Sequence, residues 1–227
     1  MSRRTPRRFP PVLRASVVAA ALLASGLASC TRAQDAERGS TEAQVATRGS
    51  GGVNAPRHRD APYLILVSFD GFRWDYMDRY PAPAFQRVAR AGVRAERLIP
   101  TFPTKTFPAH YSLATGMYAE NHGLVGNHYW DPARRERYDM ADRAVVEDGA
   151  WYRGEPLWVT AELQGMVAAA SFFVGSEADV KGVRPTHWHR YDETFPNEAR
   201  VDRVLEWLKM PEEVRPHLIT LYFADVD

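Results

Sequence analysis

The stretch YLILVSFDG, residues 63–71, decides the fold class of this 227-residue chain. It is a nearly continuous apolar run that ends in an acidic residue and a glycine. A second run of the same kind, HLITLYF at residues 217–223, ends in ADVD at residues 224–227. Apolar runs without alternation are typical of strands that are buried on both faces of a parallel sheet. We therefore expect both runs to be buried strands of an α/β fold.

Each run ends in a carboxylate, Asp70 after the first and Asp227 after the second. Ligand sites in open α/β sheets lie beyond the carboxyl ends of the strands, so we expect the two carboxylates to face one crevice. Asp70-Gly71 could instead form a hairpin turn. No matching strand follows, however, because residues 73–90 are charged, contain two prolines and predict a helix from about Ala84.

The segment between the two strands places a hydroxyl at the start of a helix. Pro108 lacks a backbone N–H and suits the first helical turn, residues 108–115 predict a helix, and Gly116 suits its end. Thr106 then lies at or next to the N-cap, where free N–H groups and the helix dipole favour negative charge. From its position alone, Thr106 is better explained as a plain helix cap. The two strand-end carboxylates make it a candidate reacting residue.

These segments resemble the type I phosphodiesterase/nucleotide pyrophosphatase family of the alkaline phosphatase superfamily. The resemblance extends from about residue 61 to the last residue, in the motif order of the family. The matching motifs are Val67–Arg73, Thr104–Pro108, Thr115–Tyr118, His122–Asn127, Gly154–Ala161, Gly175–Glu177, Gly182–Thr186 and Leu221–Asp227. The resemblance implies an α/β fold, an alkaline-phosphatase-like sandwich with a mostly parallel central sheet, incomplete at the C-terminus of this chain.

The resemblance also implies a centre with two divalent metal ions, which we expect to be Zn²⁺, with Mn²⁺ as the alternative. Thr106 is the implied nucleophile and a metal ligand, and Asp70 binds the metal that activates it. Asp227 binds the second metal, which positions the attacking water. Two such ions can hold the attacking and leaving oxygens of an in-line displacement. The expected reaction is attack by Thr106 on phosphorus, giving a covalent phospho-threonine, followed by hydrolysis.

Three further residues match substrate-binding positions of the family. Asn127 lies where the family places an amide that hydrogen-bonds a phosphoryl oxygen, and Phe107 and Tyr191 match aromatic residues that flank the base of a nucleotide. From the residues alone, Asn127 could be a turn residue and the two aromatics ordinary core residues. Two alternatives to a nucleotide hydrolase stay open: a superfamily hydrolase of phosphomonoesters, phosphonates or lipid-headgroup diesters, and a non-catalytic lipid-anchored remnant.

The chain departs from the family at its end. In relatives, a ligand histidine follows the carboxylate that matches Asp227 by four residues, and an Asp-His pair and another histidine come later. We therefore expect this chain to be part of a longer protein, without both metals and with little or no turnover. His187 and His189 would share one face of a strand, but the family has no metal ligand there. His110 and His122 are expected to have supporting roles.

The N-terminus predicts export. Five arginines precede an apolar run over about residues 15–27, which is typical of a secretory signal and too short to span a membrane. LASC at residues 27–30 resembles a bacterial lipobox, and Cys30 is the only cysteine. We expect residues 1–30 to be a signal peptide, Cys30 to carry lipid, and the protein to be a membrane-anchored lipoprotein facing the periplasm or the cell surface. An ordinary cleaved signal is the alternative.

Composition sets the remaining organisation. Residues 31–60 contain few large apolar side chains and predict a flexible linker, and residues 61–227 predict the N-terminal portion of a catalytic domain. We expect helices over 155–163 and 197–210, the latter amphipathic with Val201, Val204, Leu205 and Leu208 on one face, and a strand over 166–174. The net charge of +1 gives no argument for binding nucleic acid.

Overall fold

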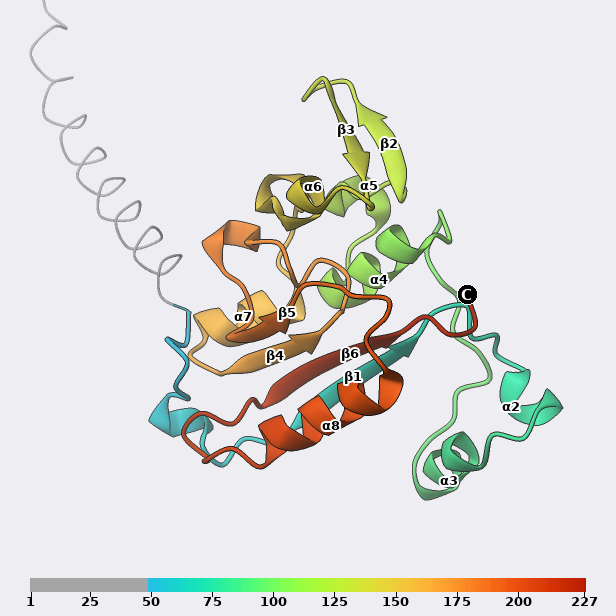
Figure 1. Cartoon of the computed structure of the whole chain (residues 1–227), viewed down its shortest axis with the longest axis vertical. Coiled ribbons are helices and arrows are strands. Elements are labelled where there is room, and N and C mark those ends of the chain that lie inside the picture. Colours follow the sequence, from blue (N-terminus) through green and yellow to red (C-terminus); the bar gives the residue numbers. More distant parts are fainter. Residues whose placement is uncertain (1–48) are drawn as a thin grey trace, which may run out of the picture. The chain divides into compact units, whose positions relative to one another are not determined.

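A four-stranded parallel sheet forms the centre of the molecule (Figure 1). The computed structural model describes residues 49–227; the predicted signal peptide, Cys30 and most of the predicted linker lie outside the described residues. The strand order is β1 (Leu64–Phe69), β6 (Leu218–Phe223), β4 (Ala168–Ser171) and β5 (His187–His189), and all neighbours are parallel. The predicted α/β fold with a mostly parallel sheet is confirmed.

The two apolar runs differ in burial. All six residues of β6 are buried, as predicted, because β6 lies between β1 and β4. In β1, however, Leu64 stays 56%, Ile65 41% and Val67 40% exposed. The prediction that β1 is buried on both faces is therefore wrong for the described residues. Its physical reason is position: within this sheet β1 pairs only with β6 and forms an edge.

Helices cover the two faces of β6 (Figure 1). Leu218 and Tyr222 belong to a core shared with α4 (Thr106–Thr115) and α7 (Leu157–Leu163). Ile219, Leu221 and Phe223 point the other way and pack with α8 (Asn197–Leu208). This alternation follows from the period of two in a strand. The sheet is thus the middle layer of a sandwich.

The predicted helices and strands occur at the expected positions, but their bounds and buried residues differ from the prediction. Helix α7 begins two residues later than predicted, and β4 covers only part of the predicted 166–174 strand. In α8 the buried residues are Arg200, Val204 and Trp207. Val201 and Leu205, which we placed on one apolar face with Val204, are 43% and 45% exposed, because they lie one residue beyond the stripe that faces the sheet.

Further elements were not predicted from the sequence. They are η1 (Pro56–His58), α2 (Tyr76–Arg79), α5 (Ala119–His122), the hairpin of β2 (His128–Asp131) and β3 (Glu136–Asp139), α6 (Arg143–Glu147), η2 (Gly149–Trp151) and η3 (Val180–Gly182). The helix predicted from about Ala84 is α3 (Pro83–Ala91). None of the helices in the described part of the chain is both long and apolar enough to cross a membrane.

Part of the segment assigned to a linker packs on the domain. Asn54 is only 1% exposed, and its Nδ2 donates to the carbonyl oxygens of Glu212 and Arg215. Its Oδ1 accepts from the backbone N–H of Val167 at 2.8 Å. The packed unit therefore begins before the residue 61 that composition suggested.

Candidate active site

One cleft of about 750 Å³ brings together the residues that the sequence singled out. Asp70, Thr106, Asn127 and Asp227 all line it, and they come from four separate segments of the chain. The cleft lies at the carboxyl ends of β1 and β6, where open α/β sheets place their ligand sites. Lys105 also lines it and is the cation next to Thr106. Hydroxyl, amide, carboxylate and ammonium groups therefore share one solvent-accessible space.

The backbone at Gly71 brings the two strand ends together. β1 and β6 run in register to Phe69 and Phe223, and the N–H of Asp70 donates to the carbonyl of Phe223 at 2.8 Å. Gly71 then adopts φ +66°, which glycine tolerates without strain. A Cβ at this position would lie 2.6 Å from the Cα of Asp227. Only glycine permits this approach of the two acidic segments.

Thr106 is the first residue of α4, one residue after the N-cap Lys105. The helix ends at Gly116, whose φ of 68° is the left-handed value of a C-cap glycine. Thr106 lies next to the N-cap, as predicted. Fewer backbone N–H groups are free at the start of α4 than we expected. Pro108 has no N–H, and the N–H of Phe107 donates to Oδ1 of Asn127 at 3.0 Å.

The same hydrogen bond orients the amide of Asn127. Because Oδ1 accepts from the helix, Nδ2 is the atom left to donate into the cleft. Asn127 therefore occupies one helix N–H and can offer its own N–H group to the cleft. An amide in this position suits an oxygen that carries negative charge.

Two hydrogen bonds fix the carboxylate of Asp70. Its Oδ1 accepts from the N–H of Gly71 at 3.0 Å, and its Oδ2 accepts from the hydroxyl of Tyr222 at 2.8 Å. Burial, and then the hydrogen bond to Asp70, raise the pKa of Tyr222 far above its ordinary value. The Tyr222 hydroxyl therefore stays protonated and acts as a permanent donor, which holds the carboxylate in one orientation.

His110 ties the first turn of α4 to β1. Its Nδ1 lies 2.8 Å from the carbonyl oxygen of Thr106, which can only accept, so Nδ1 carries the proton. In the neutral ring, Nε2 then accepts from Oγ of Ser68 at 2.7 Å. His110 is 4% exposed. Through this bridge the position of Thr106 is set by the strand that carries Asp70.

The two aromatic residues assigned to a nucleotide base lie outside this lining. Phe107 meets Tyr138 edge to face, with ring centroids 6.0 Å apart. Tyr191 packs edge to face on Phe172 at 5.5 Å and lies 6.3 Å from the ring of Tyr222. No contact between Phe107 and Tyr191 occurs in the described structure. A base held between both rings thus stays a prediction.

The cleft offers a partial set of metal ligands. Asp70, Asp227 and Thr106 supply carboxylate and hydroxyl oxygens, which suit divalent cations. Over residues 49–227, no group of three or more His, Cys, Asp or Glu side chains is arranged to hold a metal ion. His187 and His189 instead stack on Trp207, with ring centroids 6.0 and 6.1 Å away. The oxygen donors of Asp70, Asp227 and Thr106 therefore fit part of the ligand set of a metal site.

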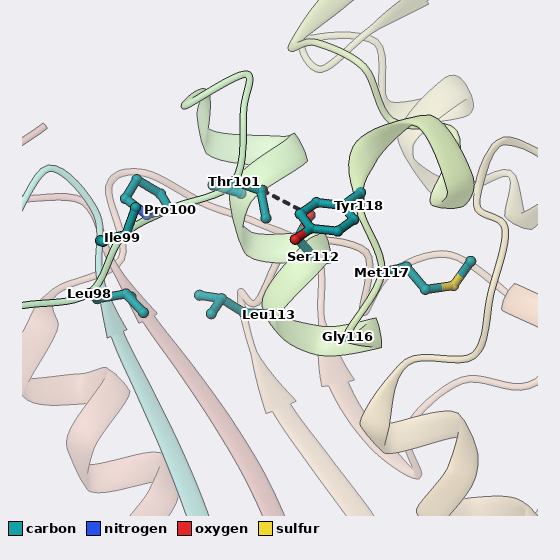
Figure 2. Close-up of a pocket in the computed structure, with 10 residues that line it drawn as sticks. Leu98, Ile99, Pro100, Thr101, Ser112, Leu113, Gly116, Met117 and Tyr118 are labelled. Carbon is teal, nitrogen blue, oxygen red and sulfur yellow. Dashed lines mark hydrogen bonds between the residues drawn. The ribbon is translucent and has the colours of Figure 1, made fainter.

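A second, smaller cavity lies next to this cleft and shares Ala109 and Leu113 of α4 with it (Figure 2). Its volume is about 300 Å³, and it is lined by the segment from Leu98 to Thr101 together with Leu113 and Tyr118. The hydroxyl of Thr101 donates to Oγ of Ser112 at 3.1 Å. Apart from these hydroxyls its lining is largely apolar, and none of the predicted reacting residues lines it.

Comparison with known proteins agrees with this geometry. The model of the family "Type I phosphodiesterase / nucleotide pyrophosphatase" matches residues 64–227. The chain is 36% identical over 174 residues to ectonucleotide pyrophosphatase/phosphodiesterase family member 1 of Homo sapiens, covering 76% of this chain and 19% of that protein. It is 37% identical over 180 residues to a venom phosphodiesterase of Crotalus durissus collilineatus, covering 78% and 22%.

Solved structures show the same relationship. Murine ectonucleotide pyrophosphatase/phosphodiesterase 5, in an inactive threonine-to-alanine form in complex with AMP, superimposes with a TM-score of 0.68 at 32% identity. The match covers 72% of this chain and 43% of that one. The human protein of the same name gives 0.68 at 35% identity, with the same coverage. This chain spans about a fifth of the length of the first curated relatives that it matches.

Proposed function

This chain belongs to the type I phosphodiesterase/nucleotide pyrophosphatase family, and we propose that its cleft carries the nucleophile of a hydrolase for nucleotide phosphodiester and pyrophosphate bonds. The observation that carries the proposal is the shared cleft of Thr106, Asp70 and Asp227. These groups come from a helix start and two strand ends. A hydroxyl that shares a cleft with two potential carboxylate ligands suits metal-assisted phosphoryl transfer.

In the proposed reaction, Oγ of Thr106 attacks phosphorus and the bond to the leaving oxygen breaks. This gives a covalent phospho-threonine, and water then cleaves the bond between phosphorus and Oγ, which regenerates the hydroxyl. Nδ2 of Asn127 donates to a phosphoryl oxygen throughout, because its Oδ1 is already committed to Phe107. Thr106 keeps its position because His110 holds the first helical turn.

The family is metal-dependent, and we propose two divalent ions, Zn²⁺ in both positions. Asp70 and Thr106 would hold one ion and Asp227 the other. The ions would stabilise the ionised hydroxyl and the charge on the phosphoryl oxygens. Because the described residues supply only part of the ligands, residues 49–227 alone are expected to turn over little or no substrate.

A nucleotide is the proposed substrate. The murine structural relative is solved in complex with AMP, and the chain carries Tyr191 near the end of β6, lining a pocket of about 420 Å³ with Ala224 and Asp225. An aromatic ring can stack on any base, so broad tolerance of base identity is expected. Phe107 is proposed as the second ring of the base site.

Metal removal and a single substitution test this function in the full-length gene product. A chelator should abolish hydrolysis of nucleotide diesters and Zn²⁺ should restore it, while Thr106→Ala should lose nearly all turnover. The matched control is Thr115→Ala, the same change at the other end of α4, where the hydroxyl bonds the carbonyl of Tyr111. Turnover that survives in Thr106→Ala would exclude the covalent route.

For the N-terminus, we propose lipidation at Cys30 after cleavage before that residue, and anchoring of the exported protein to a membrane. The basic leader, the apolar run and LASC at residues 27–30 support it. The mature protein should enter the detergent phase, and Cys30→Ala should release it or leave it unprocessed. Mass spectrometry that finds an unmodified N-terminus after Cys30 would contradict the anchor.

A further inference from the structure

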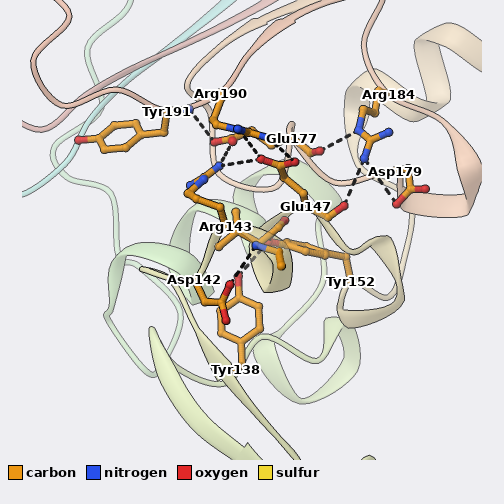
Figure 3. A network of polar contacts seen from close by, with 12 residues as sticks. Tyr138, Asp142, Arg143, Glu147, Tyr152, Glu177, Asp179, Arg184, Arg190 and Tyr191 are labelled. Carbon is orange, nitrogen blue, oxygen red and sulfur yellow. Dashed lines mark hydrogen bonds and ion pairs between the residues drawn. The ribbon is translucent and has the colours of Figure 1, made fainter.

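The segment that carries Tyr191 is held by a network of charged groups that the proposed reaction does not use (Figure 3). Arg190 pairs with Glu147 in α6 through two parallel contacts, Nε to Oε1 at 2.6 Å and the second guanidinium nitrogen to Oε2 at 2.9 Å. Paired contacts of this kind fix the direction of a guanidinium as well as its distance. The hydrogen bond from Arg190 lowers the pKa of Glu147.

A buried carboxylate holds the next residue. Glu177 is 4% exposed, and its Oε1 accepts from the backbone N–H of Tyr191 at 3.1 Å. Its other oxygen forms an ion pair with Arg143, which also lies 3.7 Å from Oε1 of Glu147. Arg184 adds a link, because it donates to the backbone carbonyls of both Glu147 and Glu177.

These contacts hold the Arg190 side chain and the backbone of Tyr191, whereas the Tyr191 ring lies outside the network and the residue is 36% exposed. In Figure 3 the charged side chains converge on the two glutamates, and the Tyr191 ring projects away from them. The ring rests on Phe172 and lies 6.3 Å from Tyr222, whose hydroxyl bonds Asp70. The network thus fixes a partly exposed aromatic ring at a set place relative to the cleft.

We propose that Glu147 and Glu177 are positioning residues for nucleotide recognition, which hold the Arg190-Tyr191 segment so that the Tyr191 ring is presented to the base. The proposal rests on the function proposed above and adds to it a determinant of specificity. A ring that is already ordered binds a base without the entropy cost of immobilising a loop. Loss of the network should therefore weaken recognition and leave the reacting groups in place.

The test is a double-mutant cycle in the full-length gene product, with a nucleotide diester and a small diester without a base. Tyr191→Ala should lower kcat/KM on the nucleotide by about 5- to 150-fold. Glu147→Gln should raise KM on the nucleotide by about 2- to 5-fold with kcat unchanged, the range of a partly exposed ion pair. In the Tyr191→Ala background the effect of Glu147→Gln should vanish, because it acts through that ring.

Glu155→Gln is the matched control, since Glu155 is also in an exposed ion pair, with Lys181 at 2.7 Å, and does not touch the segment of Tyr191. It should leave KM unchanged. The positioning role would be overturned if Glu147→Gln raised KM equally on both diesters, or if its effect persisted in the Tyr191→Ala background. Either result would leave the proposed function intact. Tyr191→Ala without effect on the nucleotide would overturn both the positioning role and the nucleotide preference.

Discussion

At the scale of single residues, Asn127 shows how one contact can define a role. The family resemblance implied an amide near the phosphoryl group at Asn127, but not which of its atoms faces the cleft. The structure answers this, because Oδ1 accepts from Phe107 and Nδ2 is left to donate. The side chain therefore caps the helix that carries Thr106, and in the proposed reaction its Nδ2 would donate to the phosphoryl group.

Asn127→Asp separates these two functions. The carboxylate can still accept from the N–H of Phe107, so the helix should remain intact by circular dichroism. It cannot donate, and its charge repels a phosphoryl oxygen, so the loss should exceed the ~3 kcal/mol expected for removal of one such donor. Steady-state kinetics on a nucleotide diester should therefore rank Asn127→Asp below Asn127→Ala. The opposite order would show that Asn127 only caps the helix.

At the scale of elements, the cleft depends on how closely β1 and β6 end beside each other. The Cβ added by Gly71→Ala would lie 2.6 Å from the Cα of Asp227, and the backbone at φ +66° adds strain. The acidic segment after β6 would have to move. We expect Gly71→Ala to lose most metal binding, measured by calorimetry with Zn²⁺ on the full-length protein.

Gly116→Ala is the matched control for that substitution. Its φ of +68° is nearly the same, but a Cβ there meets nothing within 4 Å. It should cost only the strain of the left-handed backbone, about 1–2 kcal/mol of stability, and leave metal binding unchanged. Equal losses of metal binding in both variants would show that strain, and not the approach of Gly71 to Asp227, is responsible.

The same elements show what the sequence could predict. The apolar runs of β1 and β6 predicted two parallel strands, and Pro108 and Gly116 predicted the helix between them, because these signals are local. The exposure of β1 was not predictable, since burial depends on which strands pair with it. The hairpin of β2 and β3 was missed because its strands, of four residues each, are polar and contain no long apolar run.

Some features of the candidate site were likewise predictable from the sequence, and others were not. Convergence of Asp70 and Asp227 followed from strand ends that share one edge of the sheet, and the family resemblance added Thr106 at the start of α4. A supporting role for His110 was predicted, but its partners and the role of Tyr222 were not, because both side chains reach their partners across elements. A signal for Tyr222 was present in the register, since it lies beside Ser68, two residues before Asp70. That signal could be used only once the parallel pairing of β1 with β6 was known.

At the scale of the whole molecule, three histidines with lowered pKa values should make stability depend on pH. Burial lowers the pKa values of His122, His187 and His189 below the ordinary 6.5. As the pH falls below 6.5, the unfolded chain therefore takes up protons that the folded chain resists, and the free energy of unfolding decreases. Stability from these groups is full above 6.5 and is lost as the pH falls through their folded values.

Thermal unfolding of the expressed protein between pH 8 and pH 5 checks this expectation. The midpoint should be flat at the upper end and decrease below about 6.5. His189→Gln, on the exposed edge of the sheet, should reduce the decrease without abolishing folding. A midpoint that is constant to pH 5 would show that the three rings are protonated as easily in the folded chain as in the unfolded one.

The central claim is that Thr106 attacks phosphorus, and trapping the covalent intermediate tests it most directly. The full-length protein is mixed with a nucleotide diester, quenched in acid within milliseconds and digested with trypsin, which cleaves after Lys105 and releases residues 106–134. Mass spectrometry should find this peptide heavier by one nucleotidyl group, located on Thr106, and the adduct should be absent from Thr106→Ala. A protein that turns over substrate with no adduct, or with an adduct on another residue, would contradict the account.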